Sequence, residues 1–380
     1  MKKKLLILFE NSLKKVYYWY FVVWRRKRST NKVTLQHRLR DAGVDLIPLT
    51  DYEKQIIRER FSGFWINWKW FEYYKTAYHV LHDDKYDFTK VIPADIFYPY
   101  VDPYFAHPID GFTYSDKNMT DLLLHDVKTP LTVLRYQEGL FMDGNYNIVT
   151  KEEAKRLMNA YDQLIVKPSY ISGAGHGIFF WRKEDGFSAV ERIFSGDTNY
   201  VVQEVVKQHP EMSELNQDSI NTIRMQTLIW KGEVHLISCA MRMGTKGSRV
   251  DNLTDGGGMS VGVNINDGTI TPKAYNYYRL NVTYDESPMG RKFSDFKVPS
   301  WDKCVDLVKK TAPRFARMSK LIAWDIAILE NGDPVVIESN LMLSGVEILQ
   351  LDNGPVFGEF TDQIIDTVRK NPRKTYGVKY

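Results

Sequence analysis

Two carboxylates stand where a short β-hairpin would bring them face to face. Apolar, β-branched runs flank the turn-forming residues 330–333. A two-residue loop and a four-residue loop over this turn both pair Asp325 with Glu338, and Asn340 lies two residues further on the same face. Opposed carboxylates repel each other. We therefore predict a divalent cation here, and these oxygen donors suit Mg²⁺ better than zinc. The alternative is an exposed polar sheet face, or one carboxyl group with a raised pKa.

A glycine-rich segment follows a lysine at the end of an apolar run. Residues 164–166 are apolar and lead into Lys167 and Pro168, and residues 172–177 then read Ser-Gly-Ala-Gly-His-Gly before a second apolar run. Glycines at alternate positions let backbone N–H groups approach phosphate oxygens, and a lysine at a strand end adds a fixed cation. The pattern is typical of a loop that covers a nucleotide. The alternative is a glycine-rich turn without a ligand.

The motifs of several other classes of protein are missing from the sequence. There is no GxxxxGK[ST] phosphate loop, no GxGxxG after a strand, no GxSxG elbow and no HExxH zinc motif. Two cysteines in 380 residues cannot frame a disulfide scaffold, and they fit a reducing compartment. No run of eighteen uncharged apolar residues occurs, so we expect no membrane span. A composition of 43% apolar and 26% charged residues is that of a globular protein.

The positive charge of the chain is concentrated at its N-terminus. Residues 1–40 contain twelve Lys and Arg and one acid, which gives this segment a net charge of +11. Because the net charge of the whole chain is +4, residues 41–380 have a net charge of −7. Glu10 and Lys14 interrupt the first apolar run, and we expect no signal peptide. Read as a helix, residues 5–24 form an apolar stripe that ends in the basic run 25–28, which suits an anionic membrane surface. The alternative is a helix packed on the body of the protein. Because the rest of the chain is acidic, we predict no nucleic-acid partner.

An aromatic-rich segment without proline precedes the glycine-rich loop. Residues 51–90 predict helices. We expect them to bury four aromatic side chains, namely Phe61, Trp65, Trp68 and Phe71. Four prolines within residues 91–114 then mark an irregular connection and a boundary near residue 115.

Beyond this boundary, short β-branched runs alternate with helical stretches such as 151–162 and 301–318. This order predicts an α+β fold with antiparallel hairpins, preceded by a mainly helical, aromatic-rich N-terminal region. We divide the chain into four parts. They are a basic amphipathic segment at 1–40, a helical region at 41–115, a smaller subdomain with the glycine-rich loop at 116–200, and a larger subdomain with the carboxylate pair at 201–380.

The order of these motifs resembles that of the ATP-grasp enzymes. The matching features, spread over residues 116–340, are Lys117, Lys167 with its glycine-rich loop, the strand end at 203–206, and Asp325 with Glu338. Residues 219–224, 241–244, 250–252 and 256–258 are similar to the branch described as sugar-transfer-associated ATP-grasp proteins, which is found with polysaccharide biosynthesis. The resemblance implies an ATP-grasp fold, in which two α+β subdomains grip ATP. Residues 1–114 depart from the α/β lobe with which such enzymes commonly begin.

The resemblance also implies a role for each matching residue. It implies that ATP is held at its α and β phosphates by Lys117 and Lys167, at its triphosphate by Ser172, Gly173, Gly175 and Gly177, and at its adenine by Gln203, Glu204, Val205 and Val206. It implies that Mg²⁺ is held by Asp325, Glu338 and Asn340. It implies that Arg224 and Arg242 are catalytic and stabilise the transferring phosphoryl group, and that Asp251 and Asn252 contact substrate.

Some of these assignments keep an alternative. Lys128 stands eleven positions after Lys117 and could take its place. Glu204 could be an ordinary strand residue. A two-residue turn between their strands would send Arg224 and Arg242 to opposite faces, whereas a three-residue loop would put them on one face.

The mechanism that the resemblance implies is phosphoryl transfer from ATP to a carboxylate, which gives an acyl phosphate and ADP. An amine, or a hydroxyl, then attacks the activated carbonyl. The branch implies that a small carboxylate such as an amino acid is joined to a sugar or glycan acceptor of a surface polysaccharide. We expect a cytoplasmic protein, at the inner face of the membrane if residues 1–40 bind there. A kinase acting on a sugar hydroxyl and a non-catalytic scaffold of a polysaccharide assembly complex remain alternatives.

Overall fold

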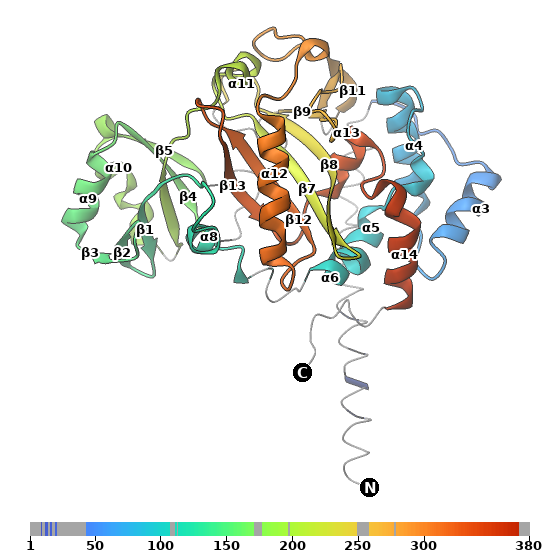
Figure 1. Cartoon of the computed structure of the whole chain (residues 1–380), viewed down its shortest axis with the longest axis horizontal. Helices are drawn as coiled ribbons and strands as arrows, with labels where there is room; N and C mark the ends of the chain where they lie inside the picture. The colour runs from blue at the N-terminus through green and yellow to red at the C-terminus, as the bar shows by residue number, and fades with distance from the viewer. Residues whose placement is uncertain are drawn as a thin grey trace.

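The computed structural model describes residues 43–371 apart from 107–110, 112, 171–176, 197, 249–257 and 277–278, together with residues 9, 12, 13, 16 and 20. Three parts lie in a row (Figure 1): a small sheet, a large sheet and a group of helices. Strands and helices alternate and both sheets are antiparallel, as the sequence predicted for an α+β fold.

The small sheet has six strands. Their order across the sheet is β3 (Ile148–Val149), β2 (Leu140–Asp143), β1 (Thr132–Gln137), β6 (Tyr200–Glu204), β4 (Gln163–Pro168) and β5 (Phe179–Arg182). The helices α9 (Lys151–Asn159) and α10 (Ser188–Glu191) share its apolar core. Thr150 begins α9 with a capping box, in which its hydroxyl accepts the Glu153 N–H (3.2 Å) and the Glu153 carboxylate accepts the Thr150 N–H (3.0 Å).

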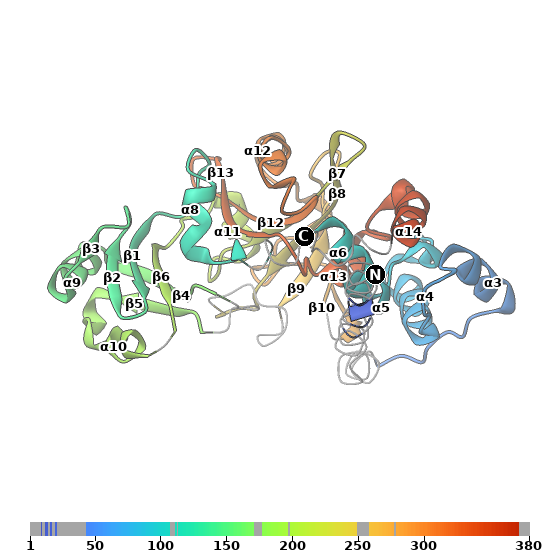
Figure 2. The same cartoon turned by 90° about the horizontal axis from the view of Figure 1, so that it is seen from below.

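The large sheet has seven strands. Their order is β11 (Arg279–Tyr284), β10 (Ala274–Asn276), β9 (Met259–Gly262), β8 (Glu233–Met243), β7 (Thr222–Trp230), β12 (Leu321–Ile328) and β13 (Pro334–Asn340). The helices α12 (Trp301–Thr311) and α13 (Val346–Asn353) pack on opposite faces of this sheet (Figure 2). The helix predicted at 301–318 gives way after Thr311 to the 3₁₀ turn η7 (Ala312–Phe315), because Pro313 has no N–H to continue it.

Short helical turns connect these elements. They are η1 (Phe88–Lys90), η3 (Lys117–Met119), α8 (Thr120–Leu123), η4 (Lys183–Asp185), η5 (Ile193–Ser195), α11 (Pro210–Leu215), η6 (Phe293–Asp295) and η8 (Gly358–Phe360).

The N-terminal region is helical and aromatic-rich, as predicted. It contains α3 (Asp51–Arg60), α4 (Trp68–His82), α5 (Ala94–Ile96), the π-helix η2 (Phe97–Val101) and α6 (Asp102–Phe105). With α14 (Thr361–Lys370), these helices share one core with the face of the large sheet that carries α13. Phe61 and Phe71 are buried and Trp68 is partly buried, as predicted. The prediction for Trp65 is wrong: it lies between α3 and α4 and is 45% exposed.

The described residues of the N-terminal segment are helical, as predicted. The apolar side chains among them are more than half exposed; they are Phe9, Leu13, Val16 and Tyr20. Other residues of the predicted helix lie outside the described part of the chain. None of the helices described is long and apolar enough to cross a bilayer. The division of the chain near residues 115 and 200 stays a prediction.

Candidate functional site

Asp325 on β12 pairs directly with Glu338 on β13, as predicted. The loop between these strands has neither of the predicted lengths. Leu329 donates its N–H to the Asp333 carbonyl oxygen (2.9 Å), which closes a three-residue loop. Such a loop alone would shift the pairing by one residue, but Ile337 bulges out of the register and restores it. The two carboxylates face each other because of this bulge.

Arginine balances the negative charge of Asp325. Its side chain is 5% exposed and accepts hydrogen bonds from Arg224 Nε and Nη2, both at 2.8 Å, while Arg242 Nη2 lies 3.1 Å away. Burial raises the pKa of Asp325, but the two guanidinium groups outweigh burial and hold that pKa at about 2. Glu338 pairs with Lys117, whose Nζ lies 3.3 Å from Oε1. Three basic side chains of the protein therefore relieve the repulsion between the carboxylates.

Arg224 on β7 and Arg242 on β8 reach this carboxylate from one face of the sheet. Their strands are joined by a two-residue turn, Lys231 and Gly232, both with positive φ (51° and 89°). From the turn length alone, we predicted that a two-residue turn would place Arg224 and Arg242 on opposite faces of the sheet. A register shift leaves Ile237 unpaired and moves the later part of β8 by one residue, so the turn-length argument was wrong.

A cavity of about 420 Å³ lies where the two sheets meet. It is lined by Pro130, Ile165, Lys167, Ile178, Phe180, Glu204, Val205, Val206, Lys207, Gln208, Ser213, Gln217, Asp218, Ser219, Ile220, Thr222 and Ile337. Lys167 and residues 204–206, which were predicted to hold the adenine, therefore meet in one place. The bulged Ile337, next to Glu338, joins them from the large sheet. Apolar residues of the two sheets line it together with polar and charged ones, a combination that suits a small-molecule ligand.

Gln203 supports Lys167 and is not among the residues that line the cavity. Lys167 is 8% exposed and its Nζ donates to Gln203 Oε1 (3.1 Å). The amide nitrogen of Gln203 lies 3.3 Å from Thr132 Oγ1 and 3.5 Å from the Pro130 carbonyl oxygen. These contacts fix the amide, and the amide in turn fixes the ammonium group of Lys167.

Lys117 and Lys128 differ in their partners. Lys117 opens η3, its N–H donates to the Ser169 carbonyl oxygen (2.8 Å), and its side chain pairs with Glu338. Lys128 pairs instead with Asp333 in the hairpin loop (3.1 Å) and is not among the residues that line the cavity. Lys117 therefore lies beside the carboxylate pair and Lys128 beside the hairpin loop, and neither residue is among those that line the cavity.

Part of the predicted site falls outside the described residues. This applies to Ser172, Gly173, Gly175, Asp251 and Asn252. Gly177 is described, with φ +74°, and a Cβ there would lie 2.8 Å from the Pro168 ring. Only glycine fits this close, left-handed turn without strain. Ile178 follows it directly into the cavity.

The residues predicted to hold Mg²⁺ lie on neighbouring strands. Asn340 pairs with Ala323, two residues along each strand from the Asp325 and Glu338 pair. Among the described residues no three His, Cys, Asp or Glu side chains gather. The predicted donors are two carboxylates and one amide. Such hard oxygen donors fit Mg²⁺, which keeps waters or phosphate oxygens as its other ligands. Glu338 is 33% exposed, so it is the more accessible carboxylate.

The sequence analysis missed the polar segment that closes one side of the cavity. Within residues 207–222, the side-chain amide of Gln208 donates to the carbonyl oxygens of Asn216 (2.8 Å) and Ser219 (3.0 Å). Its Oε1 accepts the Asn221 N–H (3.0 Å). These bonds fold the chain around α11, and polar residues of this segment line the cavity together with residues 204–206. A single glutamine in a loop has no characteristic spacing, so this role could not be predicted from the sequence.

Comparison with known families now adds to this geometry. The family model described as "Sugar-transfer associated ATP-grasp" matches residues 112–365, more than half of the chain. The chain belongs to this family. The predicted ATP-grasp fold is confirmed. The N-terminal helices of this ATP-grasp protein, residues 43–106, lie outside the match.

Solved structures similar to this ATP-grasp chain include several ligases. D-alanyl-alanine synthetase A from Vibrio cholerae O1 biovar eltor is 13% identical over 69% of this chain and 67% of its own, with a TM-score of 0.41. VanG D-Ala:D-Ser ligase from Enterococcus faecalis is 14% identical over 70% and 62% (TM-score 0.42). Biotin carboxylase from Campylobacter jejuni is 13% identical over 69% and 47% (TM-score 0.42). The chain thus spans less than two thirds of the last two. A comparison with curated proteins finds no match.

Proposed function

We propose that this ATP-grasp protein is an ATP-dependent carboxylate–amine ligase that forms an acyl phosphate and ADP. Its substrates are an amino acid or similar small carboxylate and a sugar or glycan acceptor of surface polysaccharide biosynthesis. One observation carries the proposal: the cavity that holds Lys167 meets the strand that carries Glu338, beside two arginines and Lys117. A scaffold protein has no need for ionised groups gathered in this way.

In this proposal the cavity holds the base of ATP. Apolar side chains such as Ile178 and Ile337 contact its faces, and the backbone of residues 204–206 meets its edge. The Glu204 N–H already donates to the Leu131 carbonyl oxygen (2.9 Å), so an N–H for the base comes from Val205 or Val206. Lys117 and Lys167 contact the α and β phosphates. The glycine-rich loop, with Ser172, Gly173, Gly175 and Gly177, covers the triphosphate.

Asp325, Glu338 and Asn340 are the residues that would hold Mg²⁺. When bound, the ion would neutralise charge on the phosphate oxygens of ATP. The protein itself brings Arg224 and Arg242 to the same place, and both are anchored on Asp325. The two guanidinium groups hold the pKa of Asp325 at about 2, so it is ionised at neutral pH and aligns both arginines before the ion binds.

The proposed reaction has two steps. A carboxylate oxygen of the substrate attacks the γ-phosphorus, the bond to the β,γ-bridging oxygen breaks, and ADP leaves. The amine then attacks the acyl carbon, and the tetrahedral species expels phosphate as the nitrogen loses its proton. Arg224 and Arg242 stabilise the negative charge that develops in both steps. Asp251 and Asn252 contact the substrate in this proposal. No protein nucleophile takes part.

An ADP-release assay with paired substrates tests this function. We expect ADP release only when a carboxylate and an amine are both present, and hydroxylamine in place of the amine should trap the acyl phosphate as a hydroxamate. Glu338→Ala should reduce the rate by about 100-fold or more, the usual effect of removing an electrostatic group from an active site. ADP release without an amine, together with a stable phosphosugar, would favour the sugar kinase instead.

We also propose a cytoplasmic location at the inner face of the membrane. The helical positions 9, 13, 16 and 20 expose apolar side chains, and the segment 1–40 carries the excess of basic residues. The full chain should sediment with vesicles that contain phosphatidylglycerol and not with pure phosphatidylcholine. Substitution of Leu13→Glu should weaken this binding. Equal sedimentation with both vesicles, or no effect of the substitution, would speak for another role of the segment.

A further inference from the structure

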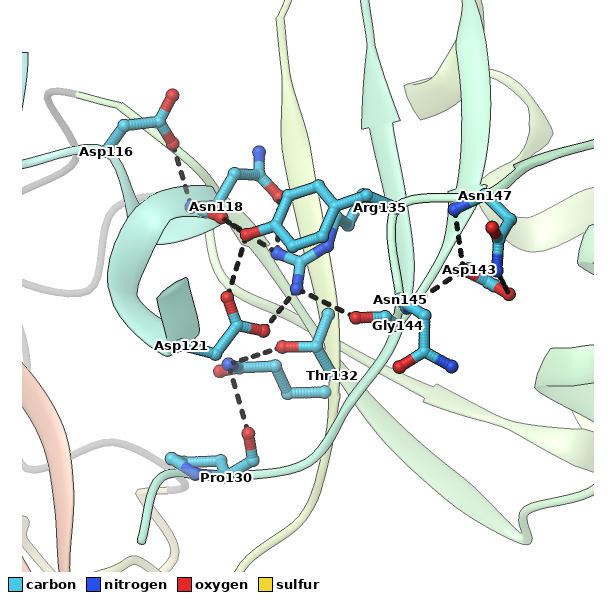
Figure 3. Close-up of polar contacts among 12 residues, drawn as sticks. Asp116, Asn118, Asp121, Pro130, Thr132, Arg135, Asp143, Gly144, Asn145 and Asn147 are labelled. Atoms are coloured by element: carbon cyan, nitrogen blue, oxygen red, sulfur yellow. Dashed lines mark hydrogen bonds and ion pairs between the residues drawn. The ribbon is translucent and has the colours of Figure 1, made fainter. Parts of the chain in front are cut away.

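A buried arginine lies in the small sheet, away from the carboxylate pair. Arg135 on β1 is fully buried, and its guanidinium group points toward the short helical segment formed by η3 and α8 (Figure 3). Nη1 donates to the Asn118 carbonyl oxygen (3.0 Å), and Nη2 donates to Asp121 Oδ2 and to the Gly144 carbonyl oxygen (3.3 Å). Burial of an ionised side chain is unfavourable unless its partners satisfy it. Two of these partners, Asn118 and Asp121, belong to the segment that carries Lys117, and Gly144 belongs to the turn between β2 and β3.

Tyr146 completes this cluster from the turn between β2 and β3. Its ring lies against the guanidinium group, with Arg135 Cζ 3.9 Å from the ring centroid. Its hydroxyl lies 2.8 Å from Asp121 Oδ1 and also contacts the Asn118 carbonyl oxygen. Its backbone is left-handed, with φ of 65°, which is uncommon for a bulky residue. We call Asp121, Arg135 and Tyr146 the Arg135 latch.

The latch holds the backbone next to Lys117. The 3₁₀ turn η3 is only three residues long, and Asp116 begins it by accepting the Asn118 N–H (2.9 Å). Such a short turn has little stability of its own. Its place is set on one side by the latch at Asn118 and on the other by the bond from the Lys117 N–H to the Ser169 carbonyl oxygen (2.8 Å). From this support the Lys117 side chain reaches Glu338 in the other sheet.

We propose that Asp121, Arg135 and Tyr146 are positioning residues that set the place of the Lys117 ammonium group for the phosphates of ATP. This rests on the proposed function, in which Lys117 contacts the α and β phosphates. None of the three latch residues is among those that line the cavity, so they act through Asn118 and the turn. A small displacement of a charged group is enough to weaken its contact with a bound substrate.

The substitution Tyr146→Phe tests the latch most cleanly. It removes the hydroxyl group and keeps the ring against Arg135, so the sheet should still fold. We expect the Kd for MgATP, measured by calorimetry, to rise about fivefold, as for the loss of one hydrogen bond. The Kd for adenosine, which has no phosphate, should stay unchanged. The control Asn147→Ala removes a bond to Asp143 Oδ2 (2.9 Å) in the same turn and should change neither constant.

A double-mutant cycle with Lys117→Met shows whether the latch acts through Lys117. Once the ammonium group is gone, Tyr146→Phe should cause no further loss of MgATP affinity. Asp121→Asn gives the same cycle with a second latch residue, should the first variant fold poorly. Three results would each overturn the proposed role of the latch. They are an unchanged Kd for MgATP in Tyr146→Phe, an equal loss of affinity for adenosine, and additive losses of MgATP affinity in the cycle. Failure of the parent protein to bind MgATP would overturn the proposed function instead.

Discussion

The ionised residues of the site are already in contact with one another. Arg224 and Arg242 share Asp325, and Lys117 pairs with Glu338. When ATP and a cation bind, contacts to the phosphates and to the cation must therefore replace some of these pairs. Buried charges that keep a partner at every stage are less costly than charges left alone in a site of low polarity. At this scale the residue types were predictable from the sequence, but their pairing was not, because four strands and the turn η3 contribute to it.

A buried acid outside the site gives a prediction about stability and pH. Asp352 on α13 is fully buried and accepts a hydrogen bond from Ser260 Oγ (2.6 Å). Burial raises its pKa from the ordinary 3.8 to about 8, and the bonds from Ser260 and Tyr275 only partly oppose this. The folded state therefore keeps a proton that the unfolded state releases above about pH 4. The contribution of protonated Asp352 to the free energy of unfolding is fully present below about pH 4 and is lost progressively as the pH rises toward 8.

The substitution Asp352→Asn should remove this loss, because an amide cannot ionise. Urea unfolding at pH 5 and pH 8 should show that the variant gains about 2 to 4 kcal/mol relative to the parent over that range. The control is Asp333→Asn, since Lys128 and Lys303 lower the pKa of Asp333 and its contribution changes only in acid. A parent and variant whose free energies of unfolding run parallel from pH 5 to pH 8 would contradict the prediction.

At the scale of elements, bulges decide how the site is assembled. The unpaired Ile337 brings Asp325 opposite Glu338, and the unpaired Ile237 brings Arg224 and Arg242 to one face. A shift of one residue turns every later side chain of a strand to the other face. Turn sequences predict the hairpins themselves, but a bulge inside an apolar strand has no mark in the sequence. The predicted pairing of the carboxylates was correct although the predicted loop was not.

Other elements were predictable because local chemistry fixes them. Thr150 and Glu153 form a capping box at the start of α9, and Pro313 ends the helix predicted from residue 301. The left-handed turn at Gly177 agrees with the glycine-rich loop found in the sequence. The latch around Arg135 was not predicted. Its members come from three separate segments, and only the folded sheet brings them together.

At the scale of the whole molecule, the N-terminal helices and the large sheet form one body. Gln350 on α13 accepts the Ile92 N–H (2.8 Å) and donates to the Ile92 carbonyl oxygen (3.1 Å). The Tyr78 hydroxyl donates to the Gln350 carbonyl oxygen (2.7 Å). Prolines in the sequence marked the irregular connection near residue 115, but they could not show that the helices before it pack on α13. Such packing depends on residues more than two hundred positions apart.

The central claim is that the junction of the two sheets binds MgATP, and thermal unfolding with and without MgATP tests it most directly. The unfolding temperature of the parent should rise by several degrees at saturating MgATP. Lys167→Met and Glu338→Gln should lose most of this rise, whereas Glu330→Gln, an exposed carboxylate in the turn of the same hairpin, should keep it. A parent that MgATP does not stabilise, or variants that respond as the parent does, would contradict the account.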